Sequence, residues 1–240
     1  MSDYDHENFS EGDWDDRSEL AWSEFDWERY LCEQEDTFHR YLALYAKYRT
    51  RPDRLDKVAY HMGWDSGEWA SAHPLGEDED FPDDDLFAGL ADERFEDDDT
   101  EDPMDPYTLY RHPIFVATKS LYMSLHETWE RLISNPANQL HPQLVNSYQK
   151  CLQQGETNAI FAIHALDMGD YTLCVAQLKR ALSALNNSIH FLEEVSGSRT
   201  YATSIYQQEA LTQLFDLREI WLRVIKYCRE EANRRYNEGD

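Results

Sequence analysis

Large apolar side chains recur every three or four residues along most of the chain, the spacing that places side chains on one helix face. From residue 107 onward this pattern predicts four long helices. Their expected ranges are about 107–135, 142–168, 170–195 and 203–235. The connections between them are short, so consecutive helices should be antiparallel neighbours. The pattern therefore predicts an all-α fold with an antiparallel up-down bundle of four long helices.

Turn residues separate the predicted helices. Asn135-Pro136 ends the first helix, and His141-Pro142 opens the second. Gly169-Asp170 is a tight turn in which Asp170 is a natural N-cap. Within the second helix, Gly155 interrupts the apolar stripe and is a candidate break point.

The segment Ala165-Leu166-Asp167-Met168-Gly169-Asp170-Tyr171, together with Val175-Ala176 and Ala181-Leu182, resembles the turn of a tetratricopeptide repeat. In that family the Gly permits a close helix turn and the Tyr packs between the two helices. A solenoid of such repeats needs several units at a fixed period, and the chain has no second copy. The resemblance therefore implies a helix hairpin at this turn.

Two further helices are expected before the bundle, at about 18–48 and 52–62. The predicted buried face of the longer one contains Trp27, Leu31, Phe38, Leu42 and Tyr45. We expect these two helices to pack against the side of the bundle. The sequence thus predicts an N-terminal region, residues 1–106, and a helical bundle domain, residues 107–240.

Charge separates these two regions. The net charge is −26, and residues 1–106 contain 34 acidic and 9 basic side chains, against 14 and 13 in residues 107–240. Residues 77–105 contain 16 acids and one base, so we expect a largely irregular acidic linker there. Because binding to phosphates depends on clustered Lys and Arg, we expect no direct binding to nucleic acid and none to anionic membranes.

Four apolar residues lie inside the acidic run: Leu86, Phe87, Leu90 and Phe95. They are typical of anchors for a protein partner, with the acids steering the segment to a basic surface. Two other interpretations stay open. The run is a solvated linker, or it docks on the basic side chains of the chain's own last helix.

Metal ligands are a second candidate chemistry. His126 with Glu130, and His190 with Glu194, have the i, i+4 spacing of ligands in metal-binding bundles. No Glu-x-x-His motif occurs, and both histidines flank their apolar stripes. We therefore predict surface or rim histidines, with no metal, cofactor or catalytic residue assigned. Nucleotide-binding loops and nucleophile elbows are absent from the sequence.

The four cysteines form no Cys-x-x-Cys pair, and the N-terminus lacks the pattern of a secretory signal. We expect reduced thiols in a cytoplasmic protein. The leading hypothesis is a non-catalytic protein-interaction or scaffold module. The alternatives are a ferritin-like metal-binding bundle enzyme that uses His126, Glu130, His190 and Glu194, and an acidic nucleic-acid mimic that binds a DNA-binding protein.

Overall fold

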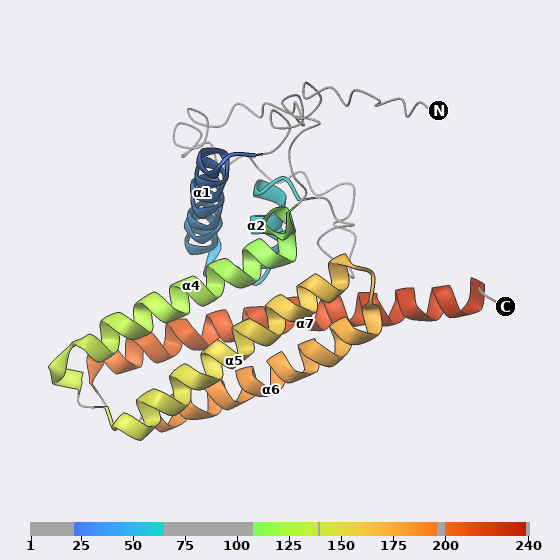
Figure 1. Ribbon diagram of the computed structural model, residues 1–240. Coiled ribbons are helices and arrows are strands. Elements are labelled where there is room, and N and C mark those ends of the chain that lie inside the picture. The colour runs from blue at the N-terminus through green and yellow to red at the C-terminus, as the bar shows by residue number, and fades with distance from the viewer. Residues whose placement is uncertain (1–21, 65–107, 139, 196–199, 239–240) are drawn as a thin grey trace, which may run out of the picture. The chain divides into compact units, whose positions relative to one another are not determined.

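A computed structural model describes residues 22–64, 108–138, 140–195 and 200–238 (Figure 1). Within these residues the secondary structure is entirely helical, as the sequence predicted. The elements are α1 (Glu24–Tyr48), α2 (Arg54–His61), η3 (Leu109–Arg111), α4 (Pro113–Ser134), η4 (Pro136–Asn138), α5 (Pro142–Asp167), α6 (Tyr171–Val195) and α7 (Tyr201–Glu238). The predicted acidic linker, 77–105, lies outside the described residues.

The chain divides into two compact units, which we describe separately. The described part of the first is residues 22–35, the start of α1. Trp22, Trp27 and Tyr30 form an aromatic cluster there, with the two Trp ring centroids 5.0 Å apart. The second unit contains residues 36–64 and all described residues from 108 onward.

Helices α4 to α7 form the predicted antiparallel bundle in the second unit (Figure 1). The inner face of α7 is an apolar stripe at helical spacing, and all its side chains are buried: Ala210, Leu214, Leu217, Trp221, Val224 and Cys228. Trp129, Tyr148 and Tyr206 form an aromatic layer between α4, α5 and α7, with Trp129 and Tyr148 centroids 4.5 Å apart. The core is thus built from one apolar stripe of each helix.

Local sequence explains the helix ends. His112 and His141 each precede a proline, and each His ring accepts a hydrogen bond from the backbone N–H two residues later. Gly169 adopts φ +72° in the turn between α5 and α6, a conformation that glycine adopts without strain. The candidate break at Gly155 is absent, because α5 continues through it.

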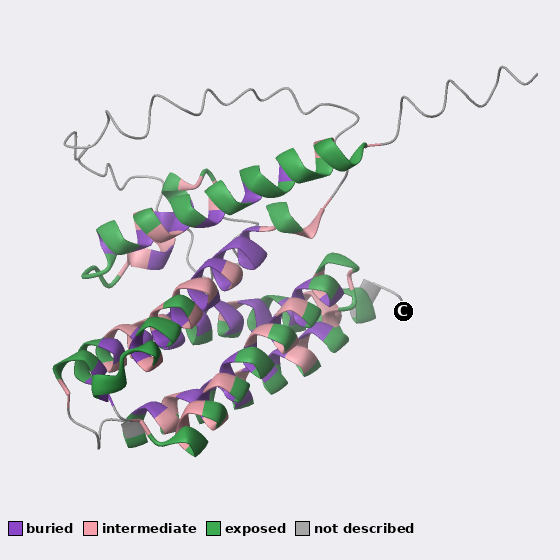
Figure 2. Cartoon of the chain, turned by 60° about the vertical axis from the view of Figure 1, so that its left-hand side comes forward, coloured by how far each residue is buried: buried purple, intermediate pink, exposed green. Residues whose placement is uncertain are grey.

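Residues 36–64 cover one side of the bundle. The first half of α4 is buried almost all round, a property of helices covered on two sides (Figure 2). Phe38 of α1 packs on Phe115 of α4, with centroids 6.3 Å apart. Asp216 of α7 accepts a bidentate ion pair from Arg54, with both N–O distances 2.6 Å. The expected packing of the N-terminal helices on the bundle therefore holds for this segment.

The predicted buried face of the first helix was partly wrong. Trp27 and Leu31 are exposed, and Leu42 is half-buried. The buried side chains of α1 that belong to the second unit are Phe38, Tyr41, Tyr45 and Tyr48. The predicted face included Tyr45 but not Tyr41 or Tyr48, because tyrosine carries much apolar area but has a polar end and is easily left out of an apolar stripe.

Candidate functional site

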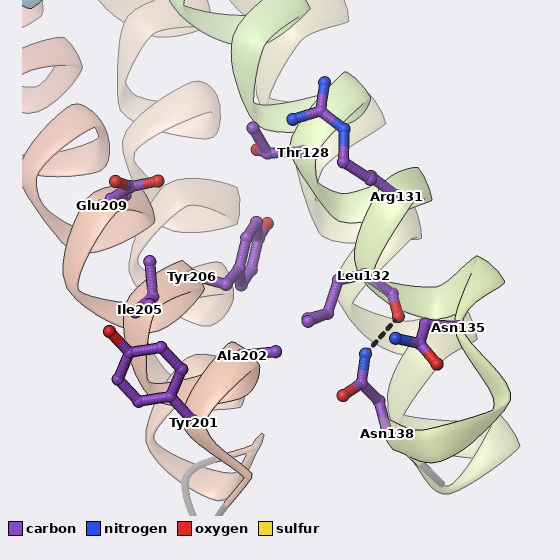
Figure 3. A pocket seen from close by; sticks show the side chains of 10 residues that line it. All are labelled: Thr128, Arg131, Leu132, Asn135, Asn138, Tyr201, Ala202, Ile205, Tyr206 and Glu209. Carbon is purple, nitrogen blue, oxygen red and sulfur yellow. Dashed lines mark hydrogen bonds between the residues drawn. The ribbon is translucent and has the colours of Figure 1, made fainter.

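The strongest candidate site is a groove where α4 ends and α7 begins (Figure 3). It has a volume of about 350 Å³. Its walls come from the last turns of α4, from η4 and from the first turns of α7. The lining residues are Thr128, Arg131, Leu132, Asn135, Asn138, Tyr201, Ala202, Ile205, Tyr206 and Glu209. We call it the α4–α7 groove.

The floor of the α4–α7 groove is apolar and fixed. Leu132 and Tyr206 are both buried there. The Tyr206 hydroxyl shares a 2.9 Å hydrogen bond with the hydroxyl of Tyr148, and the Tyr206 ring packs against Trp129. Because the floor belongs to the aromatic layer of the bundle, its shape is set by the core and not by a ligand.

One end of the groove is held by backbone and side-chain hydrogen bonds. The Asn138 amide donates to the Leu132 carbonyl at 2.7 Å, which ties η4 to the end of α4 (Figure 3). The Thr200 hydroxyl donates to Asn138 Oδ1 at 3.2 Å. Thr203 is buried beside it and bonds with the Thr200 backbone. These bonds keep the two helix ends, and so the groove walls, at a fixed separation.

The rim of the groove is polar. Arg131 and Glu209 lie on opposite sides of it (Figure 3). Each is already paired within the chain, Arg131 with Glu127 at 2.6 Å and Glu209 with Arg49 at 2.8 Å. On the same wall as Glu209, Tyr201 and Ile205 of α7 expose apolar surface (Figure 3). An apolar floor inside a polar rim is the usual anatomy of a protein-binding surface.

A second cavity of about 200 Å³ shares Thr128 and Glu209 with the α4–α7 groove, so the two form a continuous depression. Its other lining residues are Leu42, Tyr45, Ala46, Arg49, Ser124, Thr212 and Gln213. Gln213 donates to the Ser124 hydroxyl at 2.9 Å, and its carbonyl oxygen has no hydrogen-bond partner among the described residues. The depression therefore extends from the η4 end of the bundle to α1.

The four residues of the metal hypothesis do not form one cluster. His126 of α4 lies 3.1 Å from Glu156 of α5. His190 of α6 lies near Glu194 of its own helix, at 3.6 Å, and is exposed. Glu130 is exposed. Across the described residues, no group of three or more His, Cys, Asp or Glu is placed to hold a metal ion.

Glu156 forms instead a polar cluster between α4 and α5. Lys119 donates to it at 2.6 Å, and His126 contacts its other oxygen. Burial raises the pKa of Glu156, but the hydrogen bonds from His126 and Lys119 outweigh burial, so its pKa lies below the ordinary value. Beside it, the buried Tyr122 hydroxyl packs against Gly155 and has no hydrogen-bond partner among the described residues.

The predicted interaction residues Leu86, Phe87, Leu90 and Phe95 lie outside the described residues. Sequence reasoning missed the α4–α7 groove, because its walls come from segments about 70 residues apart and only the bundle brings them together. One signal was available. Tyr201 and Ile205 precede the apolar stripe of α7 and lie off its face, so their apolar side chains were not expected to be part of the bundle core.

Comparison of the chain with known protein families, with curated proteins and with solved structures gave no match. Among the described helices, none combines the length and the apolar character needed to cross a membrane.

Proposed function

We propose that the protein is a non-catalytic interaction module that binds a segment of a protein partner in the α4–α7 groove. The observation that carries the proposal is the fixed apolar floor of the groove inside a rim whose charges are already paired. A partner supplies one or two large apolar side chains to the floor and backbone or polar groups to the rim.

The chemistry of the groove favours binding over reaction. Its charged side chains, Arg131 and Glu209, are engaged with Glu127 and Arg49. A general acid or base needs a group placed to exchange a proton with a substrate, and a nucleophile needs an adjacent base. The side chains that line the groove supply apolar contact and amide or hydroxyl hydrogen bonds, which are means of recognition.

The partner that we propose carries a basic surface. The net charge of −26 lies almost wholly in residues 1–106, and long-range fields of this kind accelerate association with oppositely charged proteins. Leu86, Phe87, Leu90 and Phe95 are a second set of proposed contacts. We place the protein in the cytoplasm, because its four cysteines are free thiols and a reducing compartment keeps them so.

The test compares two matched surface variants. Ile205→Arg puts a charge on the groove and Leu173→Arg puts one on α6, at residues that are 39% and 43% exposed. Each tagged variant captures partners from an extract of the source cells. The most enriched protein is then purified and titrated against both. We expect Ile205→Arg to weaken binding at least tenfold and Leu173→Arg to leave it unchanged. Equal binding by the two would refute the groove as the binding surface.

A second comparison separates the groove from the acidic anchors. Phe87→Ala/Leu90→Ala is titrated with the same purified partner at rising salt concentrations. If the anchors contribute, this variant binds more weakly while Ile205→Arg still has a further effect. A steep loss of binding with salt that neither variant changes, together with competition by DNA, would support the nucleic-acid mimic instead.

A further inference from the structure

Two cysteines from different helices meet inside the bundle. Cys174 of α6 and Cys228 of α7 are both fully buried, and their sulfur atoms are 3.6 Å apart. They are 54 positions apart in the sequence. A disulfide has sulfur atoms about 2.05 Å apart, so a closure of roughly 1.5 Å would join them.

The surrounding contacts hold the two helices at this separation. Arg235 of α7 donates to the Gly169 carbonyl at 3.2 Å and lies over the Tyr171 ring, 4.5 Å from its centroid. Tyr171 also meets Tyr227 edge-on, with centroids 6.1 Å apart. These contacts fasten α7 to the start of α6 on the same stretch of both helices as the two thiols. The sulfur atoms therefore stay close without a covalent bond.

Cys174 is fully buried, and a small reagent would reach it through local opening at the start of α6. It is the fourth residue of α6, one turn from the Gly169 turn, and the Asp170 carboxylate accepts the Leu173 N–H at 3.0 Å. First turns of helices open more readily than helix centres. A hydrogen bond between the thiols stabilises one thiolate, lowering the pKa of Cys228 and raising that of Cys174.

We propose that Cys174 and Cys228 are an oxidisable dithiol, which hydrogen peroxide converts to a disulfide that links α6 to α7. In the first step one thiolate attacks a peroxide oxygen, the O–O bond breaks, and hydroxide leaves to become water. In the second step the other thiol loses its proton and attacks the resulting sulfenic acid, and the S–O bond breaks with release of a second water. Two thiols are oxidised and one peroxide is reduced.

The disulfide would constrain the unfolded chain between residues 174 and 228, so oxidation should raise the thermal unfolding midpoint. It would also fix the C-terminal part of α7 to the α5–α6 turn. Reduction by dithiothreitol would reverse both effects. This proposal is independent of the α4–α7 groove.

The test uses the full chain with Cys32→Ser and Cys151→Ser, which leaves only the dithiol. We expect hydrogen peroxide to remove two hydrogen masses and to yield one linked peptide pair on non-reducing mapping. The unfolding midpoint should rise by several degrees and return after reduction. Adding Cys174→Ser should abolish the mass loss and the rise in the midpoint, and Cys174→Ala serves as the same control if the serine variant is unstable.

The wild-type protein supplies an internal reference, because Cys32 is exposed. If the dithiol stays reduced below the unfolding temperature while Cys32 of the wild type reacts completely, the proposal is wrong. It is equally wrong if the linked peptide forms only in denaturant, since the folded protein would then not bring the two sulfur atoms into reaction.

Discussion

Two interfaces between helices of the second unit, which we call seams, are stabilised in different ways. Between residues 36–64 and α7, the Asp216 side chain is only 7% exposed and accepts hydrogen bonds from Arg54 and Tyr45. Between α4 and α5, the contact depends on close packing, because the Tyr122 hydroxyl packs directly against Gly155. The carboxylate there, Glu156, is paired with Lys119, which is 39% exposed. The first seam depends on buried charge and the second on close packing.

The difference shows how register is specified in each seam. Helices α4 and α5 are joined by a short connection through η4, so their register is nearly set by the chain itself and packing refines it. Residues 36–64 meet α7 more than 150 positions later, and apolar faces alone allow sliding. A planar guanidinium on a carboxylate has one geometry, so Arg54 and Asp216 fix where the segment docks.

The largest expected effect is at Asp216. Asp216→Asn leaves the largely buried Arg54 guanidinium without its counter-charge, which should cost about 3 kcal/mol of unfolding free energy. Burial, the largest cause of the raised pKa of Tyr45, remains in this variant, so the tyrosine stays neutral and cannot supply the missing charge. Urea unfolding measures the loss. Glu127→Gln, in an exposed pair, is the control, and equal losses in both variants would contradict a buried-charge seam.

Gly155 tests the seam that depends on shape. A Cβ at this position would meet the Tyr122 hydroxyl, which is buried and hemmed in, so Gly155→Ala should cost about 1–2 kcal/mol. Without the clash, alanine in a helix is favoured over glycine by roughly 1 kcal/mol. Tyr122→Phe removes the clashing oxygen, which has no partner among the described residues.

We therefore predict that the effect of Gly155→Ala on stability changes sign with the residue at position 122. In the Tyr122→Phe background, Gly155→Ala should stabilise the protein, whereas in the wild type it should destabilise it. Thermal unfolding of the four proteins of this double-mutant cycle measures the coupling. Additive effects would mean that the tyrosine moves aside freely and that close packing does not define the α4–α5 seam.

These seams also mark the limit of prediction from sequence. The periodic stripes of α4, α5, α6 and α7 predicted the bundle, because each helix buries one face and the turns at Asn135-Pro136 and Gly169 are local signals. The same local reasoning treated Gly155 as a candidate break. Its role depends on Tyr122, 33 positions earlier, and no spacing rule connects the two residues.

The candidate site was still less predictable. His126 was considered as a ligand together with His190, but in the structure it faces Glu156, which the spacing argument did not include. The α4–α7 groove forms where the end of α4 meets the start of α7. It therefore depends on tertiary structure, which local sequence patterns do not specify. The proposal of a basic partner rests on composition, because the acids are concentrated before residue 107.

The pH dependence of the unfolding free energy tests the contribution of the Glu156 charge to the α4–α5 seam. Burial raises its pKa, but the hydrogen bonds from His126 and Lys119 lower it by more, so its folded pKa is depressed. A depressed carboxyl pKa stabilises the fold above the unfolded pKa of about 4.3, and the contribution is lost as pH falls through the folded value. Glu156→Gln should therefore cost about 1 kcal/mol at neutral pH, less than Asp216→Asn because Lys119 is partly exposed.

Unfolding of the wild type and Glu156→Gln at a series of pH values checks this. The difference between the two stabilities should shrink as the pH falls below the unfolded pKa of about 4.3, and disappear once the pH has passed the depressed folded pKa. A difference that persists at low pH would mean that the glutamine alters packing and not charge. A control at Glu230, which is exposed on α7, should show no such convergence.

Arg131 provides the smallest expected effect and the reference for the other three variants. It is 70% exposed and pairs with Glu127 one turn away, so Arg131→Ala should change the unfolding free energy by less than about 0.5 kcal/mol. The same variant alters the rim of the α4–α7 groove, so partner binding should weaken while stability stays constant. A stability loss above about 1 kcal/mol would instead mean that Arg131 stabilises the fold, as Asp216 does. The rim of the groove would then not differ from the two seams in its contribution to stability.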